Sequence, residues 1–266
     1  MPPLLPLSAP PISRQATRIA INGYGRIGRC YLRALHEAGL GDQFRVVAIN
    51  EPADLASIAY LTRFDSTHGR FPGVVDCTED TLIVDNQSIL VSHAHTPEEV
   101  DWDALGIDLL VECSGQYGSR SELTRFLATG CPRLLLSHPG NGAEDVDATV
   151  VFGVNHTGLD GSEGLVSNAS CTTNAVVPVL DLLHREIGIE QALLTTLHSA
   201  MNDQPLIDGY HHTDLRRTRS AMQSIIPVST GLARGVERLL AGKAGSRPRR
   251  SGYRRITSRQ STWCSR

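Results

Sequence analysis

The feature that most constrains the fold of this chain is a set of three closely spaced glycines, Gly23, Gly25 and Gly28. The residues before them, 18–22, form a short apolar run that predicts a strand, and residues 29–36 carry apolar side chains at helical spacing. A second apolar run over residues 44–50 completes a strand–helix–strand unit of about 30 residues. Such a unit joins parallel strands, so the pattern predicts a parallel sheet covered by helices.

The rest of the chain continues this alternation. Further apolar runs, most of them bounded by Gly, Pro, Asp or Asn, predict strands at residues 81–84, 88–91, 109–113, 133–137 and 149–154. Helical patterns lie between them at residues 55–63, 97–104 and 119–128. The expected fold class is therefore α/β, with a Rossmann-type doubly wound parallel sheet over residues 18–170.

A second domain is expected to begin at residue 171. Residues 174–187 predict a helix, residues 191–198 a buried strand, and residues 203–224 a long polar loop. Residues 1–17 are Pro-rich and have no basic segment before an apolar stretch, so we expect a disordered leader rather than a signal peptide.

The composition excludes several classes of protein. A net charge of -3 and a pI of about 6.4 give no general attraction to nucleic acid or to an anionic membrane. No apolar run of about 18 residues is present, so no transmembrane helix is expected. The six cysteines lack the paired spacing of a zinc site and the density of a disulfide scaffold, so we expect no metal and a reducing, cytoplasmic setting.

In this context the glycines are placed to bind a dinucleotide. Gly23 permits a tight turn, Gly25 lets the backbone approach a pyrophosphate, and Gly28 lets the helix pack closely on the sheet. Glu51, directly after the second strand, is placed to accept hydrogen bonds from ribose hydroxyls, and its charge would repel a 2′-phosphate. We therefore expect NAD rather than NADP, and the alternative is a structural glycine turn with an incidental glutamate.

A candidate nucleophile, Cys171, stands at the start of the predicted second-domain helix. The dipole and unpaired N–H groups at a helix N-terminus stabilise a thiolate. His198 closes the predicted strand and could be the base that activates this thiol. Taken alone, each has an ordinary interpretation, because most single cysteines are buried packing residues and most histidines are surface or capping groups.

Four segments, in the same order, resemble the glyceraldehyde-3-phosphate dehydrogenase family: residues 20–29, 64–71, 167–174, and 214–219 with 224–227. The resemblance covers about residues 17–240 and implies that Cys171 is the nucleophile and His198 the base. It implies the cofactor-binding residues Gly23, Gly25, Arg26, Ile27, Gly28, Glu51 and Ser137. It also implies the substrate-binding residues Ser170, Thr172, Arg217 and Thr230, with Asp203 lining the same pocket.

Several departures from the glycolytic pattern resemble the erythrose-4-phosphate branch of the family: Asn50 with Glu51, and residues 116–120, 137–140 and 198–204. Met201 matters most, because the glycolytic pattern usually has Thr there, and a thioether cannot replace a hydroxyl donor. Weaker binding of inorganic phosphate would favour water as the acceptor of the acyl group. The branch implies NAD-dependent oxidation of the aldehyde of D-erythrose 4-phosphate to 4-phosphoerythronate through a cysteine thioacyl intermediate, in pyridoxal phosphate biosynthesis.

The resemblance ends near Leu240, whereas family members continue well beyond that point. Residues 241–266 are basic and lack hydrophobic periodicity, so we expect an aberrant, disordered tail and no core strand. The α+β catalytic domain over residues 171–240 is then incomplete, which puts the family's homotetramer in doubt. We expect weak or absent activity and exposed apolar surface on the helix after Cys171. Two other functions remain open: an ordinary glyceraldehyde-3-phosphate dehydrogenase, and a non-catalytic remnant that retains a nucleotide-binding fold.

The composition of the tail also generates a prediction about the gene. Residues 243–266 are crowded with Arg and Ser, which is typical of GC-rich coding DNA read in a shifted frame. Across residues 249–263, the adjacent frame permits Ala-Val-Arg-Val-Pro-Thr and then Val-Thr-Ala-Ile-Asp-Leu, which resembles the next strand of the family. We predict that the nucleotide sequence beyond codon 242 encodes this strand in that frame. An adjacent frame without family-like sequence would instead support a genuine basic C-terminus.

Overall fold

The computed structural model describes residues 16–201, 204–211, 214–228, 230–241 and 255–263. The chain divides into two compact units, Met1–Asp147 with Glu163–Ser167, and Ala148–Ser162 with Asn168–Arg266. The observed division differs from the expected boundary at residue 170, because Ala148–Ser162 belongs to the second unit. The expected leader, residues 1–17, lies outside the described residues except for its last two positions.

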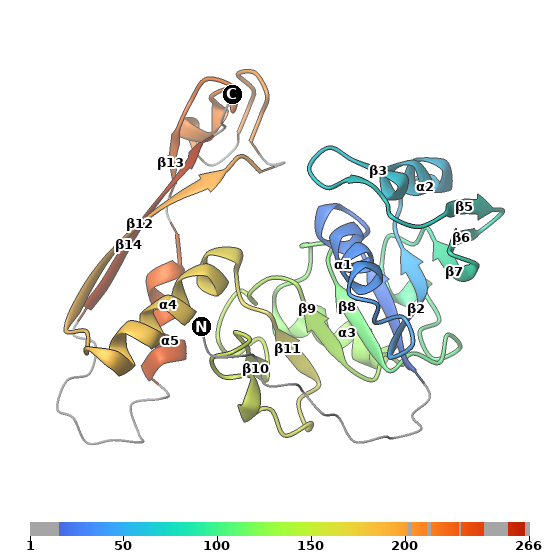
Figure 1. Ribbon diagram of the computed structural model, residues 1–266, viewed down its shortest axis with the longest axis horizontal. Helices are drawn as coiled ribbons and strands as arrows, with labels where there is room; N and C mark the ends of the chain where they lie inside the picture. The colour runs from blue at the N-terminus through green and yellow to red at the C-terminus, as the bar shows by residue number, and fades with distance from the viewer. Residues whose placement is uncertain (1–15, 202–203, 212–213, 229, 242–254, 264–266) are drawn as a thin grey trace. The chain divides into compact units, whose positions relative to one another are not determined.

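The first unit is built on a sheet whose strands follow the order β11-β9-β8-β1-β2-β7-β6-β5 (Figure 1). The strands from β11 to β7 pair in parallel, and β7, β6 and β5 pair antiparallel. Their bounds are β1 (Thr17–Asn22), β2 (Phe44–Asn50), β5 (Val75–Thr78), β6 (Thr81–Val84), β7 (Gln87–Ser92), β8 (Leu109–Glu112), β9 (Leu134–Leu136) and β11 (Leu165–Ser167).

The parallel strands confirm the predicted fold class. Numbered along the chain, β1, β2, β7, β8, β9 and β11 stand in the spatial order 3-2-1-4-5-6, which is the order of doubly wound dinucleotide-binding folds. The order reverses between β1 and β8, and ligands of such sheets bind outside the carboxyl ends of the strands at this point.

Helices cover both faces of the sheet: α1 (Arg26–Glu37), α2 (Leu55–Arg63) and α3 (Arg120–Ala128). Successive side chains of a strand point to opposite faces. Ala20 accordingly belongs to a buried cluster with Phe126 of α3, and Ile21 belongs to another with Leu32 of α1 and Ile58 of α2. A short antiparallel hairpin, β3 (Phe64–Asp65) and β4 (Gly69–Arg70), follows α2.

A row of buried hydrogen bonds joins the carboxyl ends of four neighbouring strands. The Asn22 amide donates to the Glu112 carboxylate (2.5 Å), and the Asn50 amide donates to the Asn22 side-chain oxygen (2.8 Å). The Ser92 hydroxyl donates to the Asn50 side-chain oxygen (2.9 Å). These residues end β1, β8, β2 and β7, so the row holds the four strand ends level. Burial raises the pKa of the Glu112 carboxyl above its usual range.

Two predicted elements are much shorter than expected. The predicted helix at residues 97–104 is only a 3-10 turn, η1 (Pro97–Glu99), because the Pro97 carbonyl accepts the Val100 N–H (3.4 Å) and the buried Trp102 indole N–H (3.0 Å) rather than an i+4 N–H. The predicted strand at residues 149–154 is reduced to β10 (Ala148–Thr149). Here the Asn155 side chain accepts from the Val151 N–H (2.7 Å) and donates to the Thr149 carbonyl (2.8 Å), which uses the groups that a longer strand would pair.

The second unit contains the short turn η2 (His156–Gly158) and two helices, α4 (Cys171–Glu186) and α5 (Leu232–Ala241). Its sheet has the order β12-β14-β13, with β12 (Gln191–Ser199), β13 (Ile226–Val228) and β14 (Arg255–Trp263). The predicted long loop before β13 contains one 3-10 turn, η3 (Leu215–Thr218). Val177 and Leu180 of α4 are buried in one cluster with Leu232 and Val236 of α5.

The prediction that the basic tail forms no strand is wrong for residues 255–263. β14 pairs in parallel with β12 over its whole length and antiparallel with β13. Main-chain hydrogen bonds do not require an apolar pattern, and the segment contains the strand-forming residues Ile256, Thr257 and Thr262. The remainder of the predicted tail, residues 242–254 and 264–266, lies outside the described residues.

The expected exposed surface on α4 is found only in part. The α4 face that carries Val177 is covered by α5, whereas several apolar residues of the second half of α4 and of its C-cap are exposed: Val179, Leu182, Leu183 and Ile187. In the part of the chain that the structure describes, no helix is long and apolar enough to cross a membrane.

The glycine turn after β1 generates a prediction about stability. Gly23 has φ of +85°, and a Cβ there would overlap the Ser114 backbone, whereas Gly25 is extended and has open space at that position. We expect Gly23→Ala to lower the free energy of unfolding by roughly 1–3 kcal/mol or more, and Gly25→Ala to change it by less than about 1 kcal/mol. Urea unfolding of both variants measures the difference, and equal losses would contradict this account of the turn.

Candidate active site

The glycine turn brings the start of α1 against the end of β1. The Gly23 N–H donates to the Asn50 carbonyl (2.9 Å), and Gly25 caps α1. A Cβ at Gly28 would overlap the Gly23 carbonyl and lie 3.2 Å from Cγ2 of Ile21. The absence of side chains at Gly23 and Gly28 therefore allows this close approach, and the first N–H groups of α1 stay available to an anion.

Glu51 lies directly against this turn. Its carboxylate accepts a hydrogen bond from the Tyr24 N–H (2.8 Å) and another from the Ala53 N–H (3.3 Å). The Glu51 N–H donates to the Ser92 carbonyl (2.9 Å), which continues the line of β2. The Glu51 carboxylate is thus held beside the glycine turn, where dinucleotide-binding folds bind the adenosine ribose of the cofactor.

Arg26 and Ile27 begin α1 beside the turn. The Arg26 guanidinium is paired with Asp65 of the β3–β4 hairpin, and the Ile27 side chain is exposed. The Asp65 carboxylate also accepts the His68 and Thr67 N–H groups (both 2.8 Å). The His68 N–H, the Thr67 N–H and Arg26 together lower the pKa of Asp65 to about 2.

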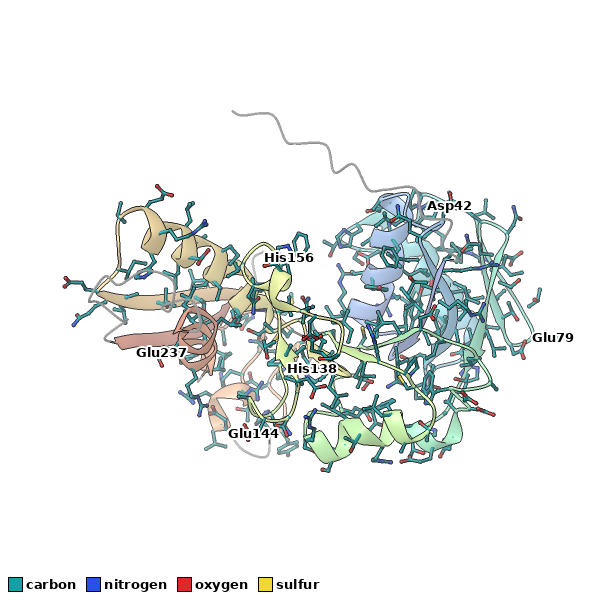
Figure 2. All side chains as sticks on the ribbon, turned by 90° about the horizontal axis from the view of Figure 1, so that it is seen from below. Asp42, Glu79, His138, Glu144, His156 and Glu237 are labelled. Atoms are coloured by element: carbon teal, nitrogen blue, oxygen red, sulfur yellow. The ribbon has the colours of Figure 1, made fainter. Side chains whose placement is uncertain are left out.

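Ser137 follows β9 at the same edge of the sheet, and its N–H donates to the Glu112 carbonyl (2.9 Å). Next to it, His138, labelled in Figure 2, donates from Nδ1 to the Pro139 carbonyl (2.7 Å). The His138 Nε2 atom is buried and has no hydrogen-bond partner among the described residues. This edge therefore offers an unsatisfied polar atom as well as a turn shaped for a dinucleotide, and its residues fit NAD.

Two residues of this edge were missed by the sequence analysis, Glu112 and Ser114. The Glu112 carboxylate accepts hydrogen bonds from the Ser114 hydroxyl and from the Ser114 N–H (2.7 Å), which shapes the chain at the point where the strand order reverses. The signal for Glu112 in the sequence was its place: an acidic residue directly follows the apolar run 109–111, at the end of a predicted strand.

The nucleophile candidate lies in the second unit. Cys171 is the first residue of α4, and the Ser170 hydroxyl caps the helix by accepting the Thr173 N–H (3.1 Å). The Thr172 hydroxyl lies 3.1 Å from the Ser170 hydroxyl. Cys171 is exposed, whereas burial raises the pKa of Cys131 to about 11. Cys171 is thus accessible at a helix N-terminus, the position that favours a thiolate.

His198 of β12 completes a pair with this thiol. Its Nε2 atom lies 3.2 Å from the Cys171 sulfur, and its Nδ1 atom lies 2.7 Å from the Ser199 carbonyl oxygen. A carbonyl only accepts, so Nδ1 must carry a proton. In the neutral imidazole, Nε2 is then free to accept the proton of the thiol, which is the geometry of a nucleophile with its base.

The other predicted substrate-binding residues lie on separate elements of the same unit. Arg217 is half-buried in η3, where its N–H donates to the Asp214 carbonyl (3.0 Å). The Thr230 hydroxyl accepts the Leu232 N–H (3.2 Å) at the start of α5. Asp203 lies outside the described residues. The structure thus groups Ser170, Thr172, Cys171 and His198, and the roles of these four residues, like those of Arg217 and Thr230, stay predictions.

The contact between the thiol and the imidazole can be tested without a substrate. We expect His198→Ala to slow alkylation of Cys171 by iodoacetamide about tenfold or more near neutral pH, because the thiol loses its proton acceptor. Peptide mass spectrometry after timed exposure measures the rate, and the buried Cys131 is the internal control. An unchanged rate would mean that the contact does not activate the thiol.

Comparison with protein-family models identifies both halves of this arrangement. Residues 17–120 match the model of the glyceraldehyde 3-phosphate dehydrogenase NAD binding domain, and residues 170–246 match the model of its C-terminal domain. The two matches together span more than half of the chain and confirm the predicted cofactor, NAD. The chain therefore belongs to the glyceraldehyde-3-phosphate dehydrogenase family of NAD-dependent oxidoreductases that act on aldehydes.

Proposed function

We propose that this protein oxidises the aldehyde of D-erythrose 4-phosphate to 4-phosphoerythronate, a step toward pyridoxal phosphate, with Cys171 as nucleophile and His198 as base. The observation that supports the chemistry best is the 3.2 Å contact between the Cys171 sulfur and Nε2 of His198, with Nδ1 held by the Ser199 carbonyl. The choice of substrate is supported by Met201, which stands where the glycolytic pattern carries a hydroxyl.

In the first step, Nε2 of His198 accepts the thiol proton and the Cys171 thiolate attacks the aldehyde carbon. The resulting oxyanion can accept hydrogen bonds from the Cys171 N–H, which has no intrahelical partner at this position, and from the protonated His198. Loss of a hydride from the same carbon gives a thioacyl group on Cys171. NAD, when bound, supplies the chemistry of accepting that hydride.

In the second step, water attacks the thioacyl carbon. Nε2 of His198 first releases to solvent the proton that it took from the thiol. The neutral imidazole then accepts a proton from the attacking water, and the Cys171 thiolate leaves with the electron pair of the C–S bond. The product is a carboxylic acid. The Met201 side chain has no donor with which to hold inorganic phosphate, so we propose that water, and not phosphate, is the acceptor.

For NAD, we propose that the turn at Gly23, Gly25 and Gly28 receives the pyrophosphate with the N–H groups of Arg26 and Ile27 at the start of α1. Glu51 would accept hydrogen bonds from the adenosine ribose, and Ser137 would contact the cofactor from the end of β9. Arg217 and Thr230 would bind the substrate phosphate, with Ser170 and Thr172 beside the reacting carbon.

An ordinary glyceraldehyde-3-phosphate dehydrogenase is the second candidate, because the Cys171–His198 pair serves either aldehyde equally well. A non-catalytic remnant is the third. We also propose a cytoplasmic setting. The homotetramer is typical of the family but is in doubt for this chain, and mass measurement in solution tests whether it forms.

Turnover separates the candidate functions. Although the overall turnover is expected to be weak, we expect NAD reduction to be faster with erythrose 4-phosphate than with glyceraldehyde 3-phosphate, and at most a small gain from inorganic phosphate. Met201→Thr should make the rate depend on phosphate, because it restores a hydroxyl donor. Cys171→Ser is the inactive control. A preference for glyceraldehyde 3-phosphate with phosphate would support the second candidate, and no turnover of either substrate would support the remnant.

Cofactor selectivity tests the role of Glu51. We expect Glu51→Gln to narrow the preference for NAD over NADP about tenfold, because the neutral amide no longer repels a 2′-phosphate and binds ribose hydroxyls less strongly. The amide oxygen can still accept the Tyr24 N–H, so the turn should keep its shape. Fluorescence titration with both cofactors gives the ratio, and an unaltered ratio would remove Glu51 from the cofactor site.

A further inference from the structure

We propose that Asn174 is a positioning residue for Cys171, because its side chain holds the loop before the nucleophile in a conformation that Ala169 would not adopt unaided. The inference rests on the proposed function only in taking Cys171 as the nucleophile. All of its contacts lie within the second unit.

The loop before Cys171 contains an unfavourable backbone conformation. Ala169 has φ of +56°, in the left-handed region, although it carries a Cβ. Among the described residues, the other non-glycine positions with positive φ are Glu79, Asp85 and Asn86, which lie at the tight turns between β5, β6 and β7. Aspartate and asparagine tolerate this region through local hydrogen bonds, and alanine has no such means. Some other group must therefore stabilise Ala169.

The Asn174 side chain supplies that stabilisation. Its amide nitrogen donates to the Asn168 carbonyl (2.6 Å) and to the Ser170 carbonyl (3.0 Å), which lie on the two sides of Ala169. The Asn174 N–H also donates to the Ser170 carbonyl (2.9 Å). One residue in the first turn of α4 thus holds both carbonyls that flank the strained position.

This arrangement differs from ordinary helix capping. A cap accepts a hydrogen bond from a first-turn N–H, and Ser170 already does so for Thr173. Asn174 instead donates to carbonyls that precede the helix. The Asn174 amide is therefore not needed to satisfy the N–H groups at the start of α4. It determines the direction from which the chain enters this helix.

The direction of entry decides where the thiol lies. The Ala169 side chain is buried in the same cluster as Val177 and Leu232, so its Cβ anchors the loop to the core. Cys171 follows two residues later, and its partner His198 stands on a different element, β12. If the loop relaxed, the sulfur would move while the imidazole stayed in place. Asn174 therefore acts on the reaction through the position of Cys171.

The test combines Asn174→Ala and Asn174→Asp, which removes the donor with little change of shape, with Ala169→Gly, which removes the penalty of positive φ. The rate of Cys171 alkylation by iodoacetamide at neutral pH is measured by peptide mass spectrometry, together with thermal unfolding. Asn155→Ala is the matched control, because it removes another loop-holding amide in the same unit without touching the residues before Cys171.

We expect both Asn174 variants to slow alkylation about tenfold to a hundredfold, as a misplaced reacting group does. Ala169→Gly should restore most of the rate in Asn174→Ala, and Asn155→Ala should lower stability without slowing alkylation. If Asn174→Ala does not fold, two other variants decide the question. The alkylation rate of the double variant Ala169→Gly/Asn174→Ala is then compared with that of Asn174→Asp. A normal rate in Asn174→Asp, no recovery with Ala169→Gly, or an equal loss in Asn155→Ala would each overturn the inference.

Alkylation needs neither sugar phosphate nor NAD, so the outcome is independent of the substrate. A protein that turns over no substrate but shows the Asn174 effect would contradict the proposed function and leave the positioning role intact. The reverse result, normal turnover of erythrose 4-phosphate with no Asn174 effect, would remove only the positioning role.

Discussion

The nucleotide-binding unit depends on the buried contact between Asn22 and Glu112 at the point where the strand order reverses. The Asn22 amide donates to one oxygen of the Glu112 carboxylate, and the Ser114 N–H donates to the other. Glu112 thus connects the chain that leaves β8 to the end of β1. Asn50 extends the contact to β2. Gly23 and Glu51 directly follow two of these strand ends. A dinucleotide site needs its turn and its acidic residue in fixed relation, and this row provides that relation at the cost of burying a carboxylate.

The second unit orients Cys171, the proposed nucleophile, by other means. The start of α4, the Ser170 cap and the strained Ala169 set the direction of the thiol. The Ser199 carbonyl sets the tautomer of His198. Backbone geometry therefore sets the position of the thiol, and Asn174 acts on that position through the two carbonyls that its amide holds.

Three predictions from the sequence failed because hydrogen bonds, rather than hydrophobic periodicity, decided the local structure. Residues 97–104 have helical spacing, but the Pro97 carbonyl accepts the Val100 N–H and the indole N–H of the buried Trp102 instead of an i+4 N–H. At residues 149–154, a single asparagine side chain replaced strand pairing with a local turn. Residues 255–263 lack an apolar pattern and still pair with β12 and β13, because main-chain groups pair regardless of side chains. Hydrophobic periodicity reports none of these three effects.

The sequence by itself determined the elements whose cause is local: the turn at Gly23, the helix that follows it, the acidic end of β2, and a cysteine at the start of α4. Steric freedom, periodicity and capping act over a few residues, so a pattern can report them. Tertiary structure alone decided that Nε2 of His198 faces a thiol 27 positions away, that Glu112 joins the strand ends, and that Asn174 holds Ala169. These depend on where a carbonyl or carboxylate points in space, which is set by contacts between segments far apart in the chain and is not reported by any local sequence pattern.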